Sequence, residues 1–166
     1  MLLLTVFLET NINISDVRQQ YSNAIYDRKT ATALSAMLDQ VQVNQPLLYA
    51  YKGANTALMA KHAFFPTEKW SLAKKGSAML DEAVNAAPAI AEIRFLRFAT
   101  EMNMPAITGL KKNLNRDKSM LIKIISGSTH KMEEAIYLQI KNYLLKEVNL
   151  EANEKLSIDR SIYRQQ

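Results

Sequence analysis

The chain of 166 residues contains no cysteine. This absence excludes disulfide bonds, zinc sites with thiolate ligands and a cysteine nucleophile. Glycine and proline are also scarce, with four of each. Sheet proteins place these residues in their many turns, and no segment alternates polar and apolar residues for long enough to form a strand. The sequence therefore favours long helices.

Long apolar runs are nearly absent as well. The strongest runs from Leu2 to Leu8, whereas a membrane-spanning helix takes about twenty residues. This run resembles the apolar part of a secretory signal, but it lacks a preceding Lys or Arg and a cleavage site of small residues. We interpret residues 1–11 as the remnant of an export signal or a short N-terminal segment, with a buried first helix or strand as the alternative. No transmembrane segment is predicted.

Enzyme signatures are missing too. The sequence has no glycine-rich phosphate loop, no G-x-S-x-G elbow and no H-E-x-x-H motif. Its two histidines, His62 and His130, lie far apart, and neither has the Asp, Glu or His spacing of a metal site. We therefore predict a protein that is not an enzyme and that uses no metal or cofactor, with an enzyme of unrecognised site as the alternative.

The composition is that of a globular protein, with 48% apolar and 22% charged residues. Ala, Leu, Lys, Glu, Gln and Met are abundant, and these residues favour helices. We expect one helical domain over residues 12–148, followed by a C-terminal helix over residues 149–166 whose weaker periodicity predicts fraying.

Helix signals recur along the chain. Asn13 is a candidate N-cap of the first helix and Thr30 of the second. Proline at position 46 suits the first turn of a third helix reaching His62. Further helices are predicted over residues 67–86 and 89–103, from a cap at Asn115 to Ile125, and from Ser128 or Thr129 onwards. Short links between helices favour antiparallel neighbours.

Two of these helices carry the pattern of a tetratricopeptide unit, in which small residues let the helices approach and large ones fill the gap. Tyr49 and Gly53 occupy the first helix, and Pro88 closes the unit. Between them, on the second helix, stand Gly76, Leu80 and Ala83. Gly53 and Pro88 lie 35 positions apart, about eleven more than in a standard unit. Glycine inside a helix costs about 1 kcal/mol, so Gly76 predicts close approach of a neighbouring helix.

We therefore predict an all-α fold, in which antiparallel helical hairpins stack as a tetratricopeptide-like, right-handed array of about seven helices. The extra residues around positions 62–70 form an aromatic insertion at the end of one enlarged hairpin.

A wider set of residues resembles a family of small helical proteins of uncharacterised function from Bacteroidetes-type bacteria, over roughly residues 14–126. The resemblance rests on Ala50-Tyr51-Lys52-Gly53-Ala54, Ala60-Lys61-His62-Ala63, Pro66, Gly76, Leu80-Asp81-Glu82-Ala83, Pro88, Glu92-Ile93-Arg94-Phe95-Leu96-Arg97, Asn103 and Pro105. Members of that family usually begin with a signal peptide, which implies export to the periplasm of a Gram-negative bacterium. A cytoplasmic location is the alternative. The resemblance supplies no activity, because none is established for that family.

Arg94 and Arg97 form the first candidate binding site. They share one face of an otherwise apolar helix and must reach water or find partners. One interpretation is a structural ion-pair network with Glu101, Asp81, Glu82 or Glu92. The other is a clamp for an anion or a terminal carboxylate of a partner.

The second candidate site is the aromatic insertion, made of Lys61, His62, Phe64, Phe65 and Trp70. These aromatics either seal the end of the elongated hairpin or form an exposed contact patch for a partner.

The net charge of +5 raises a third interpretation. The basic stretch from Lys111 to Lys123 is either a solvated surface or an anion-binding patch, and it motivates a nucleic-acid-binding helical domain as the alternative function. The basic residues are otherwise interleaved with acids, so the sequence favours a protein or peptide partner over nucleic acid. The leading prediction is a non-catalytic protein–protein interaction scaffold of the bacterial envelope.

Overall fold

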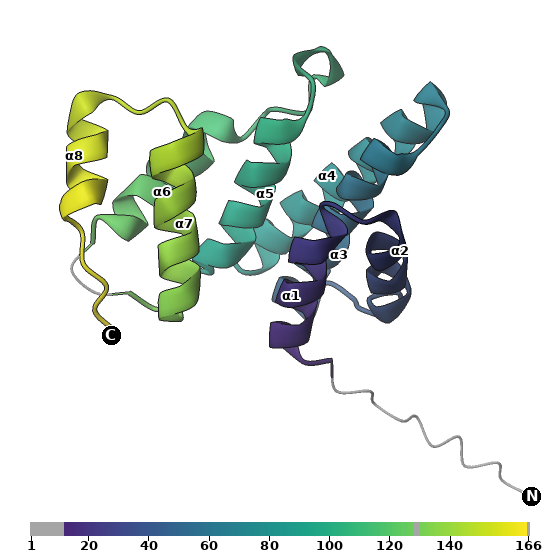
Figure 1. Cartoon of the computed structure of the whole chain (residues 1–166), viewed down its shortest axis with the longest axis horizontal. Helices are drawn as coiled ribbons and strands as arrows, with labels where there is room; N and C mark the ends of the chain where they lie inside the picture. Colours follow the sequence, from purple (N-terminus) through teal and green to yellow (C-terminus); the bar gives the residue numbers. More distant parts are fainter. Residues whose placement is uncertain (1–11, 128–129, 166) are drawn as a thin grey trace, which may run out of the picture.

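A computed structural model describes residues 12–127 and 130–165, and these residues fold as an all-helical body (Figure 1). The apolar run from Leu2 to Leu8 lies outside them. The elements in chain order are α1 (Ile14–Ala24), α2 (Arg28–Met37), α3 (Pro46–His62), α4 (Pro66–Ala86), α5 (Ala91–Asn103), the 3₁₀ turn η1 (Ala106–Thr108), α6 (Leu114–Ile125), α7 (Glu134–Glu147) and α8 (Ala152–Arg160).

Local signals place the first helices. Asn13 caps α1 as predicted, because its side chain accepts a hydrogen bond from the backbone N–H of Ser15. The predicted cap of the second helix at Thr30 was wrong. Asp27 caps α2 instead, and its carboxylate accepts hydrogen bonds from the backbone N–H groups of Lys29 and Thr30 and from the Thr30 hydroxyl. α3 spans the predicted residues, with Pro46 in its first turn.

Later helix starts also differ from the sequence prediction. α4 begins at Pro66 rather than at position 67, and α5 at Ala91 rather than at position 89. α6 begins after Asn113, two residues before the predicted cap at Asn115. The Asn113 side chain makes no cap, since it donates hydrogen bonds to carboxylates of other elements. α7 begins at Glu134 rather than at position 128 or 129. His130, which precedes α7, pairs with the C-terminal segment instead, where its backbone N–H donates to the Arg164 carbonyl.

The predicted hairpin of α3 and α4 is present, and it is tightly packed at two glycines. A Cβ built on Gly76 would lie 2.5 Å from both the Gly53 carbonyl oxygen and the Ala57 nitrogen. A Cβ on Gly53 would lie 3.0 Å from Cβ of Met79. Gly76 therefore permits the backbone approach that its place in a helix predicted. α3 continues past Gly53 to His62, and α4 begins at Pro66, well before Gly76. Figure 1 shows this end of the hairpin as an arm that projects from the body.

The body has two hydrophobic clusters that share α5. Ile93 and Leu96 pack into a cluster with α1–α4, whereas Phe95 and Phe98, on the opposite face, pack with α6–α8. In Figure 1, α5 stands between these two groups of helices. The C-terminal helix α8 joins the second cluster through Ile158, which is fully buried. The two hydrophobic clusters therefore meet at one central helix.

Among the residues described, no helix is both long and apolar enough to cross a lipid bilayer.

Candidate functional site

Arg94 and Arg97 lie inside the body, where both bind Asp117 of α6. Nη1 of Arg94 donates to Oδ1 of Asp117 at 2.7 Å. Arg97 binds the same carboxylate through two nitrogens, with Nε donating to Oδ2 and Nη2 to Oδ1 at 2.8 Å each. All three side chains are buried. Bidentate geometry of this kind is the strongest form of the Arg–carboxylate pair.

Further polar groups surround this ion pair. Nη1 of Arg97 donates to Oδ1 of Asp81 on α4 at 2.9 Å, and Nη2 of Arg94 donates to the Pro88 carbonyl. Glu101 accepts hydrogen bonds from both the backbone and the side-chain N–H groups of Asn113. Asn113 also donates to Asp81 at 3.1 Å. We call Arg94, Arg97, Asp81, Asp117, Glu101 and Asn113 the buried ion cluster; it joins α4, α5 and α6. Its edge reaches solvent, since the Asp81 side chain is 43% exposed and Asn113 is partly buried.

Burial and charge act in opposite directions on this cluster. Burial would lower the pKa of Arg97, but the hydrogen bonds and negative charges of Asp117 and then Asp81 outweigh it, so the pKa is raised. Burial raises the pKa of Glu101, and the hydrogen bonds from Asn113 and the charge of Arg97 offset this only in part. The surrounding charges therefore favour the cationic form of Arg97, whereas burial disfavours the ionised form of Glu101.

The geometry corresponds to the ion-pair interpretation of the two arginines. Asp81 and Glu101 lie in the buried ion cluster, as that interpretation allowed. Glu82 does not, since it accepts a hydrogen bond from the Tyr49 hydroxyl. An external anion would have to displace Asp117 before it could use either guanidinium as a clamp.

Sequence reasoning missed Asp117, the residue at the centre of the cluster. It lies within the stretch from Lys111 to Lys123, which the sequence predicts to be either a solvated surface or an anion-binding patch. One signal was available: Asp117, Leu121 and Ile125 are spaced by four residues, and all three are buried on one face of α6. An acid in line with an apolar stripe indicates a buried partner of opposite charge.

A second polar network joins the two halves of the body. Arg18 of α1 binds Glu92 of α5 through Nε and Nη2, at 2.7 Å each, and binds Glu133 at the start of α7 at 2.9 Å. Glu92 also accepts a hydrogen bond from the Tyr51 hydroxyl at 2.7 Å. Burial, together with the charge of Glu92, raises the pKa of Tyr51. Glu92 is thus committed to Arg18 and Tyr51, not to Arg94 or Arg97.

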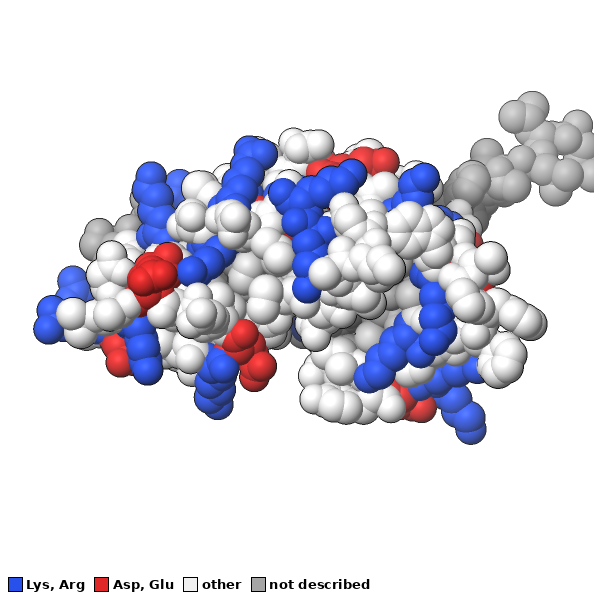
Figure 2. Space-filling model, turned by 90° about the horizontal axis from the view of Figure 1, so that it is seen from above, with Lys and Arg blue, Asp and Glu red and all other residues white. Residues whose placement is uncertain are grey.

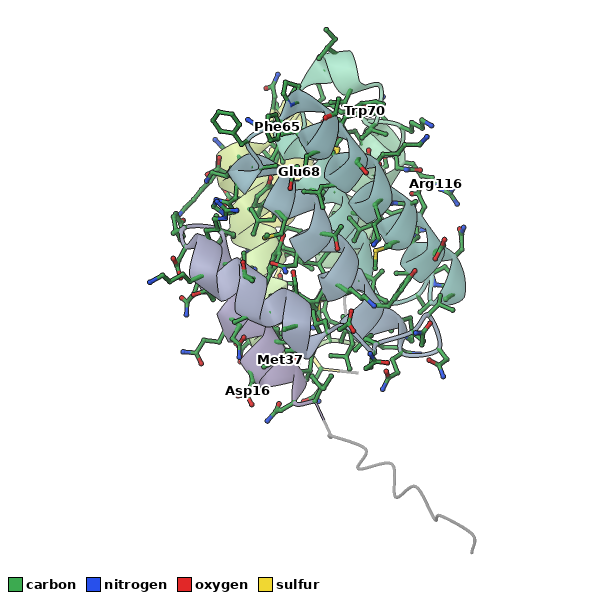
Figure 3. The ribbon with its side chains drawn as sticks, turned by 90° about the vertical axis from the view of Figure 1, so that its right-hand side faces the viewer. Asp16, Met37, Phe65, Glu68, Trp70 and Arg116 are labelled. Carbon is green, nitrogen blue, oxygen red and sulfur yellow. The ribbon has the colours of Figure 1, made fainter. Side chains whose placement is uncertain are left out.

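The aromatic insertion lies at the end of the arm and faces solvent. Phe64 is 85% exposed, Phe65 61% and Trp70 46%. The two phenylalanine rings meet edge to face, with centroids 5.1 Å apart. Figure 3 shows Phe65 and Trp70 at this end of α4. The aromatics therefore do not seal the hairpin, and we call Phe64, Phe65 and Trp70 the aromatic tip.

Lys61 and His62 lie below the aromatic tip, at the end of α3. Lys61 is exposed, and its Nζ donates to the Ile25 carbonyl in the link between α1 and α2 at 3.2 Å. His62 is partly buried, and its buried Nε2 has no hydrogen-bond partner. The structure thus separates the predicted site residues into the buried arginines, the aromatic tip and these two residues beneath it.

The predicted basic stretch is partly engaged in internal contacts. Lys111 donates to the Met102 carbonyl, and Lys118 binds the Glu154 carboxylate at 2.8 Å. Of the five basic side chains from Lys111 to Lys123, two therefore make internal contacts, while Lys112, Arg116 and Lys123 are exposed.

The remaining histidine has a structural environment. His130 is buried between Tyr137 and Tyr163, its Nδ1 accepts a hydrogen bond from the Arg164 backbone N–H, and its Nε2 lies 3.2 Å from the Ile125 carbonyl. Within residues 12–127 and 130–165, no three His, Asp or Glu side chains come together as a metal site would require. No protein-family model, curated protein or solved structure matches the chain.

Proposed function

We propose that this protein is a non-catalytic interaction scaffold, whose body holds the aromatic tip out as the docking surface for a partner outside the chain. One observation carries the proposal: three large aromatic side chains are exposed together at the end of a projecting helical arm. Grouped exposed aromatics are a mark of interaction sites.

The arm supports this proposal through its construction. Every residue from Phe64 to Ser71 is exposed, so this segment contributes little to the core of the body. Below it, the contact between Gly53 and Gly76 fixes α3 against α4. A helical support of this kind holds side chains in a defined position, which reduces the entropy lost on binding.

We also propose how the helices are arranged and where the protein acts. The helices stack in a tetratricopeptide-like, right-handed array, which is supported by the α3–α4 hairpin and its paired glycines. The protein acts in a bacterial envelope, which is supported by the family resemblance of residues 14–126.

Site-specific photo-crosslinking in the native cell tests the proposal. A benzophenone amino acid replaces Phe64 in the full chain, and a matched protein carries it at Leu156 of α8, a surface residue 49% exposed. We expect an adduct at position 64 that is absent at position 156. The adduct should disappear when Phe65→Ser and Trp70→Ser are added to the same chain. Identical adduct patterns at positions 64 and 156, or a pattern unchanged by those substitutions, would overturn the proposal.

A further inference from the structure

A second apolar projection lies at the same end of the molecule as the aromatic tip. It is the turn η1, whose Ile107 is 95% exposed. Figures 1 and 3 both show η1 and the end of the α3–α4 arm at the upper end of the molecule. Tyr26 is 86% exposed in the link between α1 and α2, the link that Lys61 contacts. The aromatic tip, Ile107 and Tyr26 thus lie on three separate segments of the chain, not in one continuous patch.

This shape restricts the kind of partner. A stable protein–protein interface buries about 800 Å² on each side with close shape complementarity. Separate protruding points offer little continuous area for such an interface. A lipid bilayer makes no such demand, because its headgroup region deforms around whatever enters it.

The charge around the aromatic tip also favours a lipid bilayer as the partner. The segment from position 61 to position 75 contains Lys61, Lys69, Lys74 and Lys75, against one acid, Glu68. Figure 2 looks onto the upper end of the molecule and shows Lys and Arg side chains spread over it, with fewer Asp and Glu. A basic surface of this kind is attracted to anionic lipid headgroups, and each Lys or Arg near the membrane adds about fivefold to binding.

The spacing of the aromatics along α4 also suits a bilayer. Phe65 precedes α4 and Trp70 lies five positions later, which is about 7.5 Å along a helix axis. An interfacial segment buries its apolar side chains roughly 5–10 Å below the headgroups. With the arm upright, phenylalanine rings in the acyl boundary would leave Trp70 at headgroup level, where tryptophan is enriched in membrane proteins.

From these observations we infer that the partner of the aromatic tip is the surface of an anionic lipid bilayer. Phe64 and Phe65 enter the acyl boundary, Trp70 lies among the headgroups, and Lys69, Lys74 and Lys75 bind lipid phosphates. This inference rests on the proposed function, because it names the partner of the same docking surface.

Trp70 provides a direct test, since it is the only tryptophan of the chain. The full-length protein is titrated with vesicles of phosphatidylcholine alone and of phosphatidylcholine mixed with phosphatidylglycerol. We expect a blue shift of Trp70 emission and co-sedimentation with the anionic vesicles only. Binding should weaken as salt approaches 1 M, where the Debye length falls to about 3 Å.

Matched variants make the test specific. Phe64→Ser with Phe65→Ser, and separately Lys69→Glu with Lys74→Glu and Lys75→Glu, should each weaken binding to anionic vesicles at least tenfold. The control variant, Lys155→Glu with Leu156→Ser on α8, should bind as the parent protein does. Circular dichroism of each variant verifies that the helices are intact.

The outcomes separate this inference from the proposed function. Absence of vesicle binding, equal binding to neutral vesicles, or equal weakening by the α8 control would overturn the bilayer as partner. If vesicles fail while crosslinking at position 64 gives a specific protein adduct, the docking surface stands and its partner is a protein. If both experiments fail, the inference and the proposed function fall together.

Discussion

Arg97 of α5 and Asp117 of α6 face each other inside the body, and two parallel hydrogen bonds of 2.8 Å join them although twenty positions separate them in the chain. Asp117 simultaneously holds Arg94. One buried carboxylate thus pairs with two guanidinium groups of α5 and fixes α6 against that helix. Removal of this carboxylate would leave uncompensated charge in a buried site.

Replacement of Asp117 by Asn should therefore lower the free energy of unfolding strongly, by about 3–5 kcal/mol. Urea denaturation followed by circular dichroism measures the change. Asp159→Asn makes the same chemical change on the exposed side of α8 and should stay within about 0.5 kcal/mol of the parent. Equal effects of the two substitutions would mean that the buried ion pair does not stabilise the fold.

Introduction of a methyl group at Gly76 should separate α3 from α4. The added Cβ would meet backbone atoms of α3 at 2.5 Å, and backbone cannot move aside as a flexible side chain can. We expect Gly76→Ala to lower the free energy of unfolding by about 1–3 kcal/mol, although alanine favours a helix more than glycine does.

Thermal unfolding measures this effect, and two control variants show how much of it is specific to Gly76. Gly53→Ala, with its nearest contact at 3.0 Å, should cost less than Gly76→Ala. Ser71→Ala, at an exposed position of the same helix, should be near neutral. An unchanged melting temperature for Gly76→Ala would show that the two helices are not in close contact.

The two acidic partners of Arg18 should contribute unequally. Glu92 is buried and bound at two nitrogens, whereas Glu133 is exposed. Double-mutant cycles with Arg18→Ala and either Glu92→Ala or Glu133→Ala measure the two coupling energies by urea denaturation. For the Glu133 pair we expect about 0.2–1 kcal/mol, and for the Glu92 pair a clearly larger value. The reverse order would contradict the assigned network.

The raised pKa of Glu101 predicts a specific pH dependence. Since the folded-state pKa lies above the unfolded one, this group favours folding most at pH values below its unfolded pKa. That contribution is lost as pH rises through the folded pKa. Glu101→Gln resembles the protonated carboxyl but cannot titrate, and its amide would face an Asn113 donor.

We therefore expect Glu101→Gln to destabilise by about 1–3 kcal/mol, and the deficit relative to the parent should shrink from pH 4 towards pH 7. Urea unfolding of both proteins across this range measures it. A deficit that grew with pH would show that the folded state lowers the pKa of Glu101.

The aromatic tip should be dispensable for folding. Phe64→Ala should change the free energy of unfolding by no more than about 0.5 kcal/mol, because the ring is exposed. Phe98→Ala, the same substitution at a buried ring of α5, should cost about 3–5 kcal/mol. A large effect at position 64, measured by urea denaturation, would assign Phe64 to the hydrophobic core.

The sequence by itself determined the helices and one helix pair. Composition and periodicity are local properties, and so are the cap at Asn13 and the proline that starts α3; each acts within a turn of its own residue. Gly76 predicted the close approach of α3 because a helix tolerates glycine where a neighbouring backbone needs the space. The predictions of helix caps at Thr30 and Asn115 were wrong. α2 begins directly after Asp27, and α6 begins directly after Asn113.

Only the tertiary structure decided which charged groups meet and which aromatics stay in water. Arg18 and Glu133 lie 115 positions apart, and Asp117 meets Arg97 across twenty. No local pattern encodes such pairs, because several acids could have reached each arginine until the helices packed. The Phe64–Trp70 segment could equally have been core or surface by its composition. Its exposure follows from the length of α3 and α4, which extend past the body and leave the aromatic tip with nothing to pack against.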